Sequence, residues 1–284
     1  MEKIKSHFQN NLILYRMIGV FSMVSALVII LLTAVMSSFY TSRLKNEIYH
    51  GQEQSLKQVA DSVSFRAEYV NTLLLQVKED EQISKLFFST DIGDAVASRK
   101  RLMDLRGSVK HLRSIYIYDG NVNRIYDSDQ FGFPFISNTN TFADKGFLEI
   151  LDHIQDYPKY NPILRKYSVT LPSGRHYEDY VYTYLVYDTY SSGKTRNIVA
   201  FNFWLDWMEE ALDFMTSDMS QSEKIWIIDN NRQIVYSSTG EMVGQQCDPA
   251  VLSDEVYDQE IGYFFVGSGR DRKMVVHATP KRSE

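Results

Sequence analysis

Tyrosine is dense along one apolar stretch of the chain, residues 177–188, and could recognise a polar ligand there. In an extended strand, alternate side chains point to the same face. The residues that share a face here are Tyr180, Tyr182, Tyr184 and Asp188. Phenol hydroxyls beside a carboxylate could hold a small polar molecule such as a sugar or an amine. Tyrosine rings also fill protein cores with the hydroxyl at the edge, and that structural role stays open.

Three further residues extend this candidate ligand site. Tyr116 and Tyr118 share a face of an earlier apolar stretch by the same two-residue period. Arg165 precedes the tyrosine-rich stretch, where it could reach an anionic ligand or cap a loop, and we favour the loop cap. The candidate ligand-binding residues are therefore Tyr116, Tyr118, Arg165, Tyr182, Tyr184 and Asp188.

The residue types of enzyme active sites do not form a recognisable set in this sequence. The histidines are scattered, with no H-x-x-x-H pair and no Cys/His cluster of zinc-like spacing. No G-x-S-x-G nucleophile elbow occurs, and Gly267-Ser-Gly269 lacks the length and the lysine of a phosphate loop. We therefore expect no catalytic residue, no metal and no cofactor, and the chain is not predicted to be an enzyme.

The composition excludes one further class of function. The chain is 44% hydrophobic and 23% charged, which is ordinary for a globular protein with a sizeable core. Its formal net charge is -6, and basic residues do not cluster into a long run. Nucleic-acid-binding surfaces normally show a clustered basic face, so we expect no nucleic acid contact by this segment.

The elements that must position the tyrosines have both strand and helix patterns, which predicts an α+β fold. Alternating, β-rich stretches occur at residues 114–119, 124–126, 177–188, 196–203, 224–229, 233–236, 262–266 and 273–278. Helical spacing occurs at residues 42–78, 81–88, 92–109, 147–154, 205–215 and 249–256. Residues 132–140 have the composition of a loop. Residues 157–174 carry Pro158, Pro162 and Pro172 and are expected to be largely irregular.

A membrane-spanning helix is the strongest signal in the sequence. No charged residue occurs between Arg16 and Arg43, about 26 positions, and a bilayer-spanning helix requires only about 20. The run is apolar on every face, whereas a helix at the edge of a soluble core has one polar side. Tyr15 and Tyr40 stand where interfacial aromatic residues would anchor such a helix.

The orientation follows from a small excess of basic residues before the span. Lys3, Lys5 and Arg16 precede it, and Arg43 and Lys45 follow it. The positive-inside rule therefore favours a cytoplasmic N-terminus with the bulk of the chain outside the cell membrane. A cleaved signal peptide is the alternative, but its apolar core would be about 7–15 residues long and would end in an A-x-A-like site.

An amphipathic helix is predicted directly after the span. Apolar residues recur at spacings of three and four from Leu56 to Val77, and the stretch holds no proline. Such a stalk could carry movement between a folded domain and the bilayer, or could simply pack along that domain. Its periodicity also suggests a homodimer.

The order of these elements resembles the double Cache sensor domains of bacterial membrane receptors. In that family a long helix leaves the first transmembrane segment and supports two PAS-like antiparallel sheets, one membrane-distal and one membrane-proximal. The segments that carry the resemblance are residues 54–59, 113–119, 182–187, 197–202 and 225–229. More narrowly, residues 114–118, 162–165 and 181–184 resemble the sensor half of a Bacillota membrane-bound AraC-type regulator. A sensor histidine kinase is the close alternative.

The resemblance implies a division of the chain and a function. The expected parts are a cytoplasmic N-terminus (1–16), a transmembrane helix (17–40), a stalk helix (41–80), a membrane-distal PAS-like subdomain (81–204) and a membrane-proximal one (205–284). Such receptors continue into a second transmembrane helix and an output domain, so we expect this chain to be truncated before them, with its proximal subdomain incomplete at the C-terminus.

The implied function is extracytoplasmic sensing of a small ligand, a sugar or another polar metabolite, by a signalling or transcription-regulating receptor. The distal half lacks the spaced Arg, Trp and Tyr signature of the amine-recognising Cache subset, and no tryptophan precedes Trp204. An amino-acid ligand is therefore unsupported. A membrane-anchored structural or interaction domain with no small ligand is the rival of a different class.

Overall fold

The computed structural model divides the chain into two compact units, Met1–Gln54 and Ser55–Glu284. It describes residues 2–88, 91–129, 133–171, 173–190, 195–216, 224–229, 231–248, 261–266 and 273–278.

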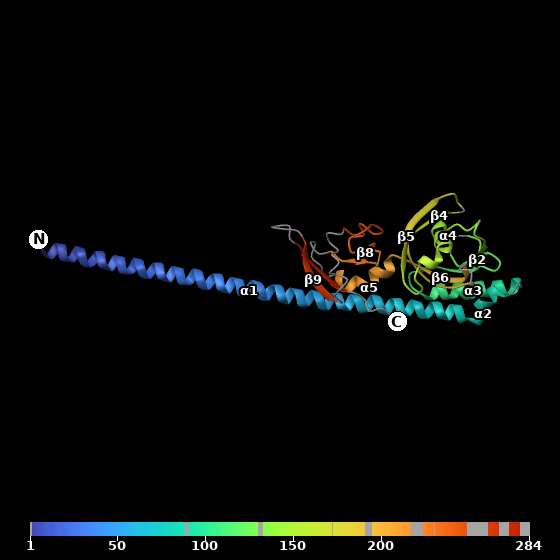
Figure 1. Cartoon of the computed structure of the whole chain (residues 1–284), viewed down its shortest axis with the longest axis horizontal. Coiled ribbons are helices and arrows are strands. Elements are labelled where there is room, and N and C mark those ends of the chain that lie inside the picture. Colours follow the sequence, from blue (N-terminus) through green and yellow to red (C-terminus); the bar gives the residue numbers. More distant parts are fainter. Residues whose placement is uncertain are drawn as a thin grey trace. The chain divides into compact units, whose positions relative to one another are not determined.

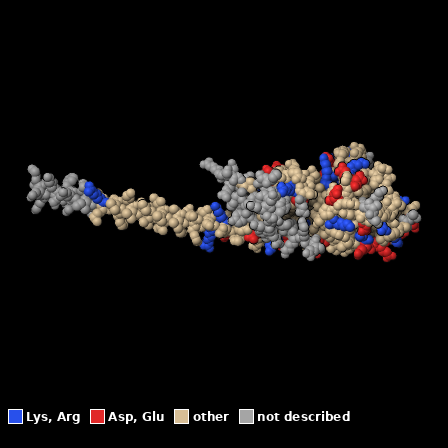
Figure 2. Space-filling view, viewed as in Figure 1, with Lys and Arg blue, Asp and Glu red and all other residues tan. Residues whose placement is uncertain are grey.

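The described residues of the first unit are all helical and belong to α1 (Glu2–Glu79). Side chains that an ordinary soluble helix would bury, such as Phe21, Leu27 and Leu31, are exposed here. Figure 2 shows the uncharged stretch of the helix with Lys and Arg at both ends. By length and composition, α1 contains a helix that can cross a membrane. The helix continues through the predicted stalk to Glu79.

The second unit contains a six-stranded antiparallel sheet in the order β3-β2-β1-β6-β5-β4 (Figure 1). The strands are β1 (Leu112–Asp119), β2 (Arg124–Asp127), β3 (Ile136–Ser137), β4 (Ile163–Thr170), β5 (His176–Thr189) and β6 (Thr195–Trp204). The predicted stretches 114–119, 124–126, 177–188 and 196–203 are confirmed as strands, and they pair antiparallel as β1 with β2 and β5 with β6. The predicted α+β class is confirmed as well.

Helices surround the sheet, and three of them begin at acidic caps. They are α2 (Glu81–Ser84), the 3-10 turn η1 (Lys85–Phe87), α3 (Ile92–Ser108), α4 (Lys145–Asp152), the 3-10 turn η2 (Ile154–Asp156) and α5 (Asp206–Thr216). Asp80, Asp91 and Asp144 each accept backbone N–H groups at the start of α2, α3 and α4. These carboxylates satisfy N–H groups that have no partner inside the helix.

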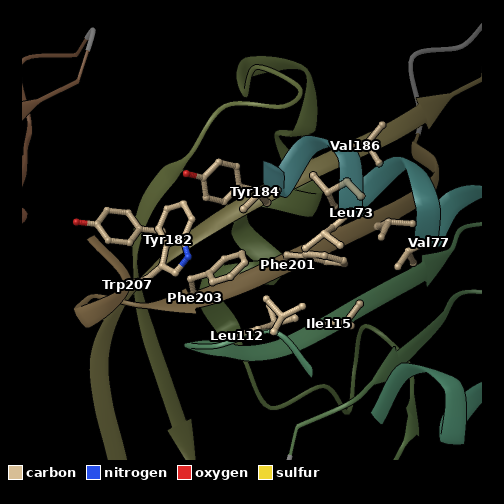
Figure 3. Packing of buried hydrophobic residues seen from close by; sticks show 14 of the residues in the cluster. Leu73, Val77, Leu112, Ile115, Tyr182, Tyr184, Val186, Phe201, Phe203 and Trp207 are labelled. Atoms are coloured by element: carbon tan, nitrogen blue, oxygen red, sulfur yellow. The ribbon is translucent and has the colours of Figure 1, made fainter. Parts of the chain in front are cut away.

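One face of the sheet packs against the last turns of α1. Figure 3 shows Leu73 and Val77 of α1 over Phe201 and Ile115 of the sheet. Each fully buried side chain of this size contributes about 1.5–3 kcal/mol relative to an exposed one. The apolar spacing that predicted the stalk helix is therefore the spacing that buries it.

The opposite face packs against α4. Phe147 and Ile150 of this helix lie in a second buried cluster with Tyr116, Leu185 and Ala200 of the sheet. Tyr116 contacts Phe147 edge-to-face, with the ring centroids 5.0 Å apart. The sheet is thus buried on both sides, which explains why β1 is buried along its whole length.

The expectation that residues 157–174 are largely irregular is wrong. Residues Ile163–Thr170 form β4, which pairs with β5 from Ile163–Thr183 to Thr170–His176. Pro162 directly precedes this strand, and β4 lies at the edge of the sheet, where a neighbouring proline removes no ladder hydrogen bond. The prolines led us to expect irregular structure where residues 163–170 alternate as a strand. Within the expected loop 132–140, Ile136–Ser137 also forms the short strand β3.

The remaining strands form two hairpins, β7 (Trp226–Ile228) with β8 (Ile234–Ser237) and β9 (Ile261–Val266) with β10 (Lys273–Ala278). All four strands were predicted from alternation. The expected helix 249–256 lies outside the described residues.

Candidate functional site

A break in the alternation of β1 turns the charged side chain of Arg113 toward the face of the sheet that α4 covers. Leu112 belongs to the cluster under α1, whereas Ser114, two residues later, bonds to Asn202 on the opposite face. The register shifts between Leu112 and Ser114, which is a β-bulge. Bulges re-aim side chains and occur often beside functional sites. Here the bulge places Arg113 against Tyr167 and Trp204, on the face that α4 covers.

A buried ion pair joins α4 to the edge of the sheet. The Arg165 guanidinium binds both Asp144 carboxylate oxygens, with Nη1–Oδ1 at 2.8 Å and Nη2–Oδ2 at 2.7 Å. The Tyr116 hydroxyl donates to the same carboxylate at 3.1 Å. Asp144 also accepts the Phe147 N–H at the start of α4. Burial opposes the charge on Arg165, but Asp144 outweighs it and raises the pKa of the guanidinium.

Arg165 also connects the strands on either side of β5. Its Nε donates to Thr183 Oγ1 at 2.7 Å, and its Nη2 donates to Asn202 Oδ1 at 2.9 Å. Asn202 in turn donates to Ser114 Oγ at 3.0 Å. These residues come from β4, β5, β6 and β1, so one hydrogen-bond network crosses most of the sheet.

A second buried ion pair lies on the same face. Arg113 Nη2 is 3.1 Å from Asp129 Oδ2, and the Tyr167 hydroxyl donates to that oxygen at 3.1 Å. The Arg113 guanidinium carbon lies 3.3 Å from the Tyr167 ring centroid and 4.4 Å from that of Trp204. Aromatic faces attract a cation most strongly when water is excluded, as it is at this buried side chain.

A third carboxyl group, that of Asp127, lies near these two pairs. Asp127 stands directly opposite Tyr116 in the β1–β2 ladder, so both side chains share the α4 face. Burial, helped by the neighbouring charge of Asp129, raises the pKa of Asp127 well above its ordinary value. With three aspartates against two arginines, a proton on Asp127 makes the group neutral.

We call these residues the polar seam, because they lie on the α4 face of the sheet between two apolar clusters. Its members are Arg113, Ser114, Tyr116, Asp127, Asp129, Asp144, Arg165, Tyr167, Thr183 and Asn202. The seam offers fixed donors and acceptors of both charge signs, which suits the recognition of a small polar molecule. In the described part of the chain, no group of three or more His, Cys, Asp or Glu is arranged to hold a metal ion.

The structure divides the predicted site residues between the two faces of the sheet. Tyr116 and Arg165 meet in the polar seam through Asp144, and Tyr118 lies on the same face beside α4. Arg165 therefore does not cap a loop, as we had favoured. It lies within β4 and is buried.

The other three predicted residues lie on the α1 face. Tyr182 and Tyr184 are buried in the cluster under α1, and Figure 3 shows their rings beside Trp207 and Phe203. The Asp188 carboxylate lies 3.1 Å from Lys78 Nζ, near the end of α1. A ligand role for all six residues stays a prediction.

Sequence reasoning missed most of the polar seam. Asp144 carried a usable signal, because an Asp three residues before Phe147 at the start of an amphipathic helix is a helix N-cap pattern. Arg113 carried a second one, a charge near the start of a strand whose centre, residues 115–118, is apolar or aromatic. Thr183 and Asn202 stand opposite each other only in the register in which β5 and β6 pair, and the sequence did not fix that register.

No protein-family model matches the chain, and no curated protein matches it by sequence. Solved structures do match. The sensory domain of the Campylobacter jejuni chemoreceptor Tlp3 with isoleucine bound aligns with a TM-score of 0.55 at 12% identity, covering 82% of this chain and 88% of that one. The extracellular domain of rpHK1S-Z16, a protein named as a histidine kinase, aligns with a TM-score of 0.57 at 12% identity, covering 84% and 91%. That of vpHK1S-Z8, also named as a histidine kinase, has a TM-score of 0.55 at 7% identity and covers 81% and 88%.

The fold is that of Cache-type, PAS-like sensor domains. At these identities the likeness establishes the fold alone, because function depends on side chains that the fold can exchange. The order of a long helix followed by an antiparallel sheet, expected from the sequence, is therefore confirmed at the level of architecture.

Proposed function

We propose that this chain senses a small ligand outside the cytoplasmic membrane, as the input part of a membrane-anchored receptor, and that the ligand binds at the polar seam. The proposal is supported by a Cache-type fold, an apolar helix long enough to span a bilayer, and a concentration of buried charge beneath α4. Structures of similar fold are sensory and extracellular domains of receptors.

The observation that carries the proposal is the bidentate Arg165–Asp144 pair with its neighbours Tyr116, Thr183 and Asn202. Replacing a buried ion pair by apolar residues of similar volume is often neutral or stabilising. A core therefore gains little stability from such a pair, and a role in recognition accounts for retaining it.

The charges of the polar seam favour a ligand that carries both signs. A ligand carboxylate could replace Asp144 on Arg165, and a ligand ammonium group could bind Asp129. An amino acid fits this exchange better than a sugar, although the sequence favoured a sugar or another polar metabolite. The Tlp3 domain of similar fold was solved with isoleucine.

The test is a thermal-shift screen of the full chain in lipid nanodiscs with amino acids and sugars. A ligand that binds only the native state raises the melting temperature, by about 2–4 °C for each kcal/mol in a domain of this size. Tyr116→Phe removes the hydroxyl bound to Asp144, and we expect it to weaken binding about fivefold, the effect of one hydrogen bond.

Tyr126→Phe is the matched control, because it removes an equally buried hydroxyl, which donates to the Leu86 carbonyl oxygen, from the opposite face of the sheet. We expect this variant to bind the ligand as the parent does. If no compound in the screen shifts the melting temperature, or if only Tyr126→Phe loses the shift, the polar seam is not the ligand site. The first outcome would favour the structural or interaction domain that was the rival hypothesis.

We also propose the division of the chain expected from the sequence, with residues 17–40 in the bilayer, the N-terminus in the cytoplasm, the distal subdomain at 81–204 and the proximal one at 205–284. A homodimer along α1 is proposed as well. Phe65 and Tyr69, four positions apart on this helix, are 72% and 47% exposed, and a second copy could cover them. A sedimentation experiment in membrane mimetic that finds a strict monomer would exclude the dimer.

The output of the receptor is proposed from the sequence resemblance alone. An AraC-type DNA-binding domain remains our preference and a histidine kinase the alternative, and the solved structures of similar fold do not favour the AraC type. Sequencing the gene downstream of the codon for Glu284 would distinguish the two.

A further inference from the structure

A single histidine lies between two carboxylates at the start of α5. His111 occupies the turn between α3 and β1, and its Nδ1 is 3.0 Å from Asp206 Oδ1. Its Nε2 is 2.8 Å from Glu210 Oε2. The His111 side chain is only 15% exposed, so the ring is largely enclosed. We call His111, Asp206 and Glu210 the histidine clip.

The protonation state of the ring decides how many of these contacts are attractive. A neutral imidazole has one N–H donor and one acceptor nitrogen, whereas the imidazolium ion donates from both. Ionised carboxylates only accept hydrogen bonds. A neutral His111 would therefore hold one carboxylate and repel the other with a lone pair, and the imidazolium would attract both.

Both carboxylates belong to a helix that connects the main sheet to the rest of the second unit. α5 follows β6 directly and buries Trp207, Met208 and Leu212 in the cluster under α1. Arg66 of α1 donates to the Trp207 carbonyl oxygen at 3.0 Å. The His111 backbone is also bonded to the end of β6, because the Trp204 N–H donates to the His111 carbonyl oxygen at 3.1 Å.

We propose that the histidine clip is a pH-sensitive contact. With a protonated ring it holds the start of α5 to the main sheet through both carboxylates, and at higher pH one of these contacts is lost. The proton would be a second signal, beyond the small ligand proposed above. Histidine is the side chain whose ordinary titration, near pH 6.5, falls in the range that an extracytoplasmic domain meets.

The charged groups around His111 come from two elements. Asp206 and Glu210 face it from α5, and Lys110 lies next to it in its own turn, with its Nζ 2.6 Å from Glu210 Oε1. Lys110, and after it His111, hold the pKa of Glu210 below its ordinary value. Glu210 is therefore held in its ionised form, which only accepts hydrogen bonds. The Lys110 contact to Glu210 does not depend on the proton of the His111 ring, so loss of that proton loosens α5 without releasing it.

The test is hydrogen exchange of α5 backbone amides in the full chain in nanodiscs, at about pH 5.5 and about pH 7.5, on either side of the ordinary histidine pKa. Rates are divided by the intrinsic rate at each pH to give protection factors. We expect protection of α5 to be about fivefold higher at the lower pH, the effect of one hydrogen bond.

His111→Asn should abolish this ratio. Asparagine suits the site because His111 has a φ of 61°, a left-handed conformation that asparagine adopts more easily than most residues. Glu210→Gln should reduce the ratio. His153→Asn is the matched control, since His153 is an exposed histidine whose Nδ1 contacts the Glu149 carbonyl oxygen and should leave the ratio unchanged.

An equal protection of α5 at both pH values in the parent chain would overturn the proposal. So would a normal ratio in His111→Asn. Should that variant lose protection in the main sheet as well, Asp206→Asn and Glu210→Gln decide instead, and an unchanged ratio in both would exclude the clip. Ligand shifts in the thermal screen are independent of this result, so failure of the clip leaves the proposed function standing.

Discussion

Asp144 accepts hydrogen bonds from a helix terminus, an arginine and a tyrosine at once. The first of these needs only an oxygen, whereas the pairing with Arg165 needs a negative charge. Asparagine is as good a helix N-cap as aspartate, so Asp144→Asn separates the two roles. What remains in that variant is a buried guanidinium without its counter-ion.

We therefore expect Asp144→Asn to lower the free energy of unfolding by about 3–5 kcal/mol, the cost of breaking a buried ion pair. Urea unfolding followed by tryptophan fluorescence of the full chain in nanodiscs measures this change. Glu178→Gln is the control, because the Lys166–Glu178 pair is exposed and its loss should not be measurable. Equal stability of Asp144→Asn and the parent would mean that the Arg165 charge reaches solvent.

Asp127 should make the stability of the protein fall as the pH rises. Its pKa is raised well above the ordinary 3.8, with burial the main cause, so the folded chain keeps this proton over a range where the unfolded chain has lost it. The contribution is complete below the ordinary pKa and is lost as the pH rises through the raised one.

Asp127→Asn keeps an oxygen that can accept from the Asp129 N–H but cannot ionise. As the pH rises from about 4, near the ordinary carboxyl pKa, to about 8, we expect the free energy of unfolding of this variant to fall less than that of the parent. Unfolding curves at several pH values measure the two slopes. Identical slopes would show that Asp127 is ionised in the folded protein.

At the scale of elements, the approach of α4 to β4 brings Arg165 and Asp144 together. Gly146 lies in the first turn of α4, and a Cβ built there would be 2.5 Å from the Lys166 carbonyl oxygen of β4. This distance leaves no room for a side chain, so the glycine permits the close contact between helix and strand.

Gly146→Ala should therefore lower the free energy of unfolding by about 1–3 kcal/mol through overpacking. Gly107→Ala is the matched control in α3, where an added Cβ would meet nothing within 4 Å. There we expect a gain of up to about 1 kcal/mol from the higher helix propensity of alanine. Thermal unfolding of both variants measures the difference, and a stabilising Gly146→Ala would show that α4 can move away from β4.

At the scale of the whole molecule, the proposed topology predicts which parts a protease can reach. In intact spheroplasts, added protease should digest the chain beyond residue 43 and leave an N-terminal tag protected, because the span is expected to hold the N-terminus inside. Permeabilised cells are the control in which both parts are digested. Protection of the folded second unit in intact spheroplasts would contradict the orientation and with it the proposed extracytoplasmic function.

Periodicity and composition were sufficient for most elements of this protein. The apolar run without charge predicted a membrane-spanning segment, and spacings of three and four predicted the part of α1 that buries Leu73 and Val77. Alternation predicted β1, β2, β5 and β6. It failed for β4, because prolines around a strand indicate irregular structure unless the position of that strand in the sheet is known.

The candidate site depended on contacts that sequence spacing does not contain. Alternation along β5 correctly placed Tyr182 and Tyr184 on one face, but it could not tell that this face packs on α1 and that Tyr116 lies on the other. Strand pairing decides which residues are neighbours across a sheet, and a bulge shifts that choice by one residue.

The sequence alone thus determined the uncharged apolar helix that can cross a membrane, the amphipathic helix after it and the α+β class, because each depends on a local pattern of polarity. Only the tertiary structure brought Arg165 to Asp144, Arg113 to Asp129 and His111 to α5. These contacts between charged side chains depend on the strand order, the β1 bulge and the packing of α4 and α5. All of these are set by contacts between residues far apart in the chain.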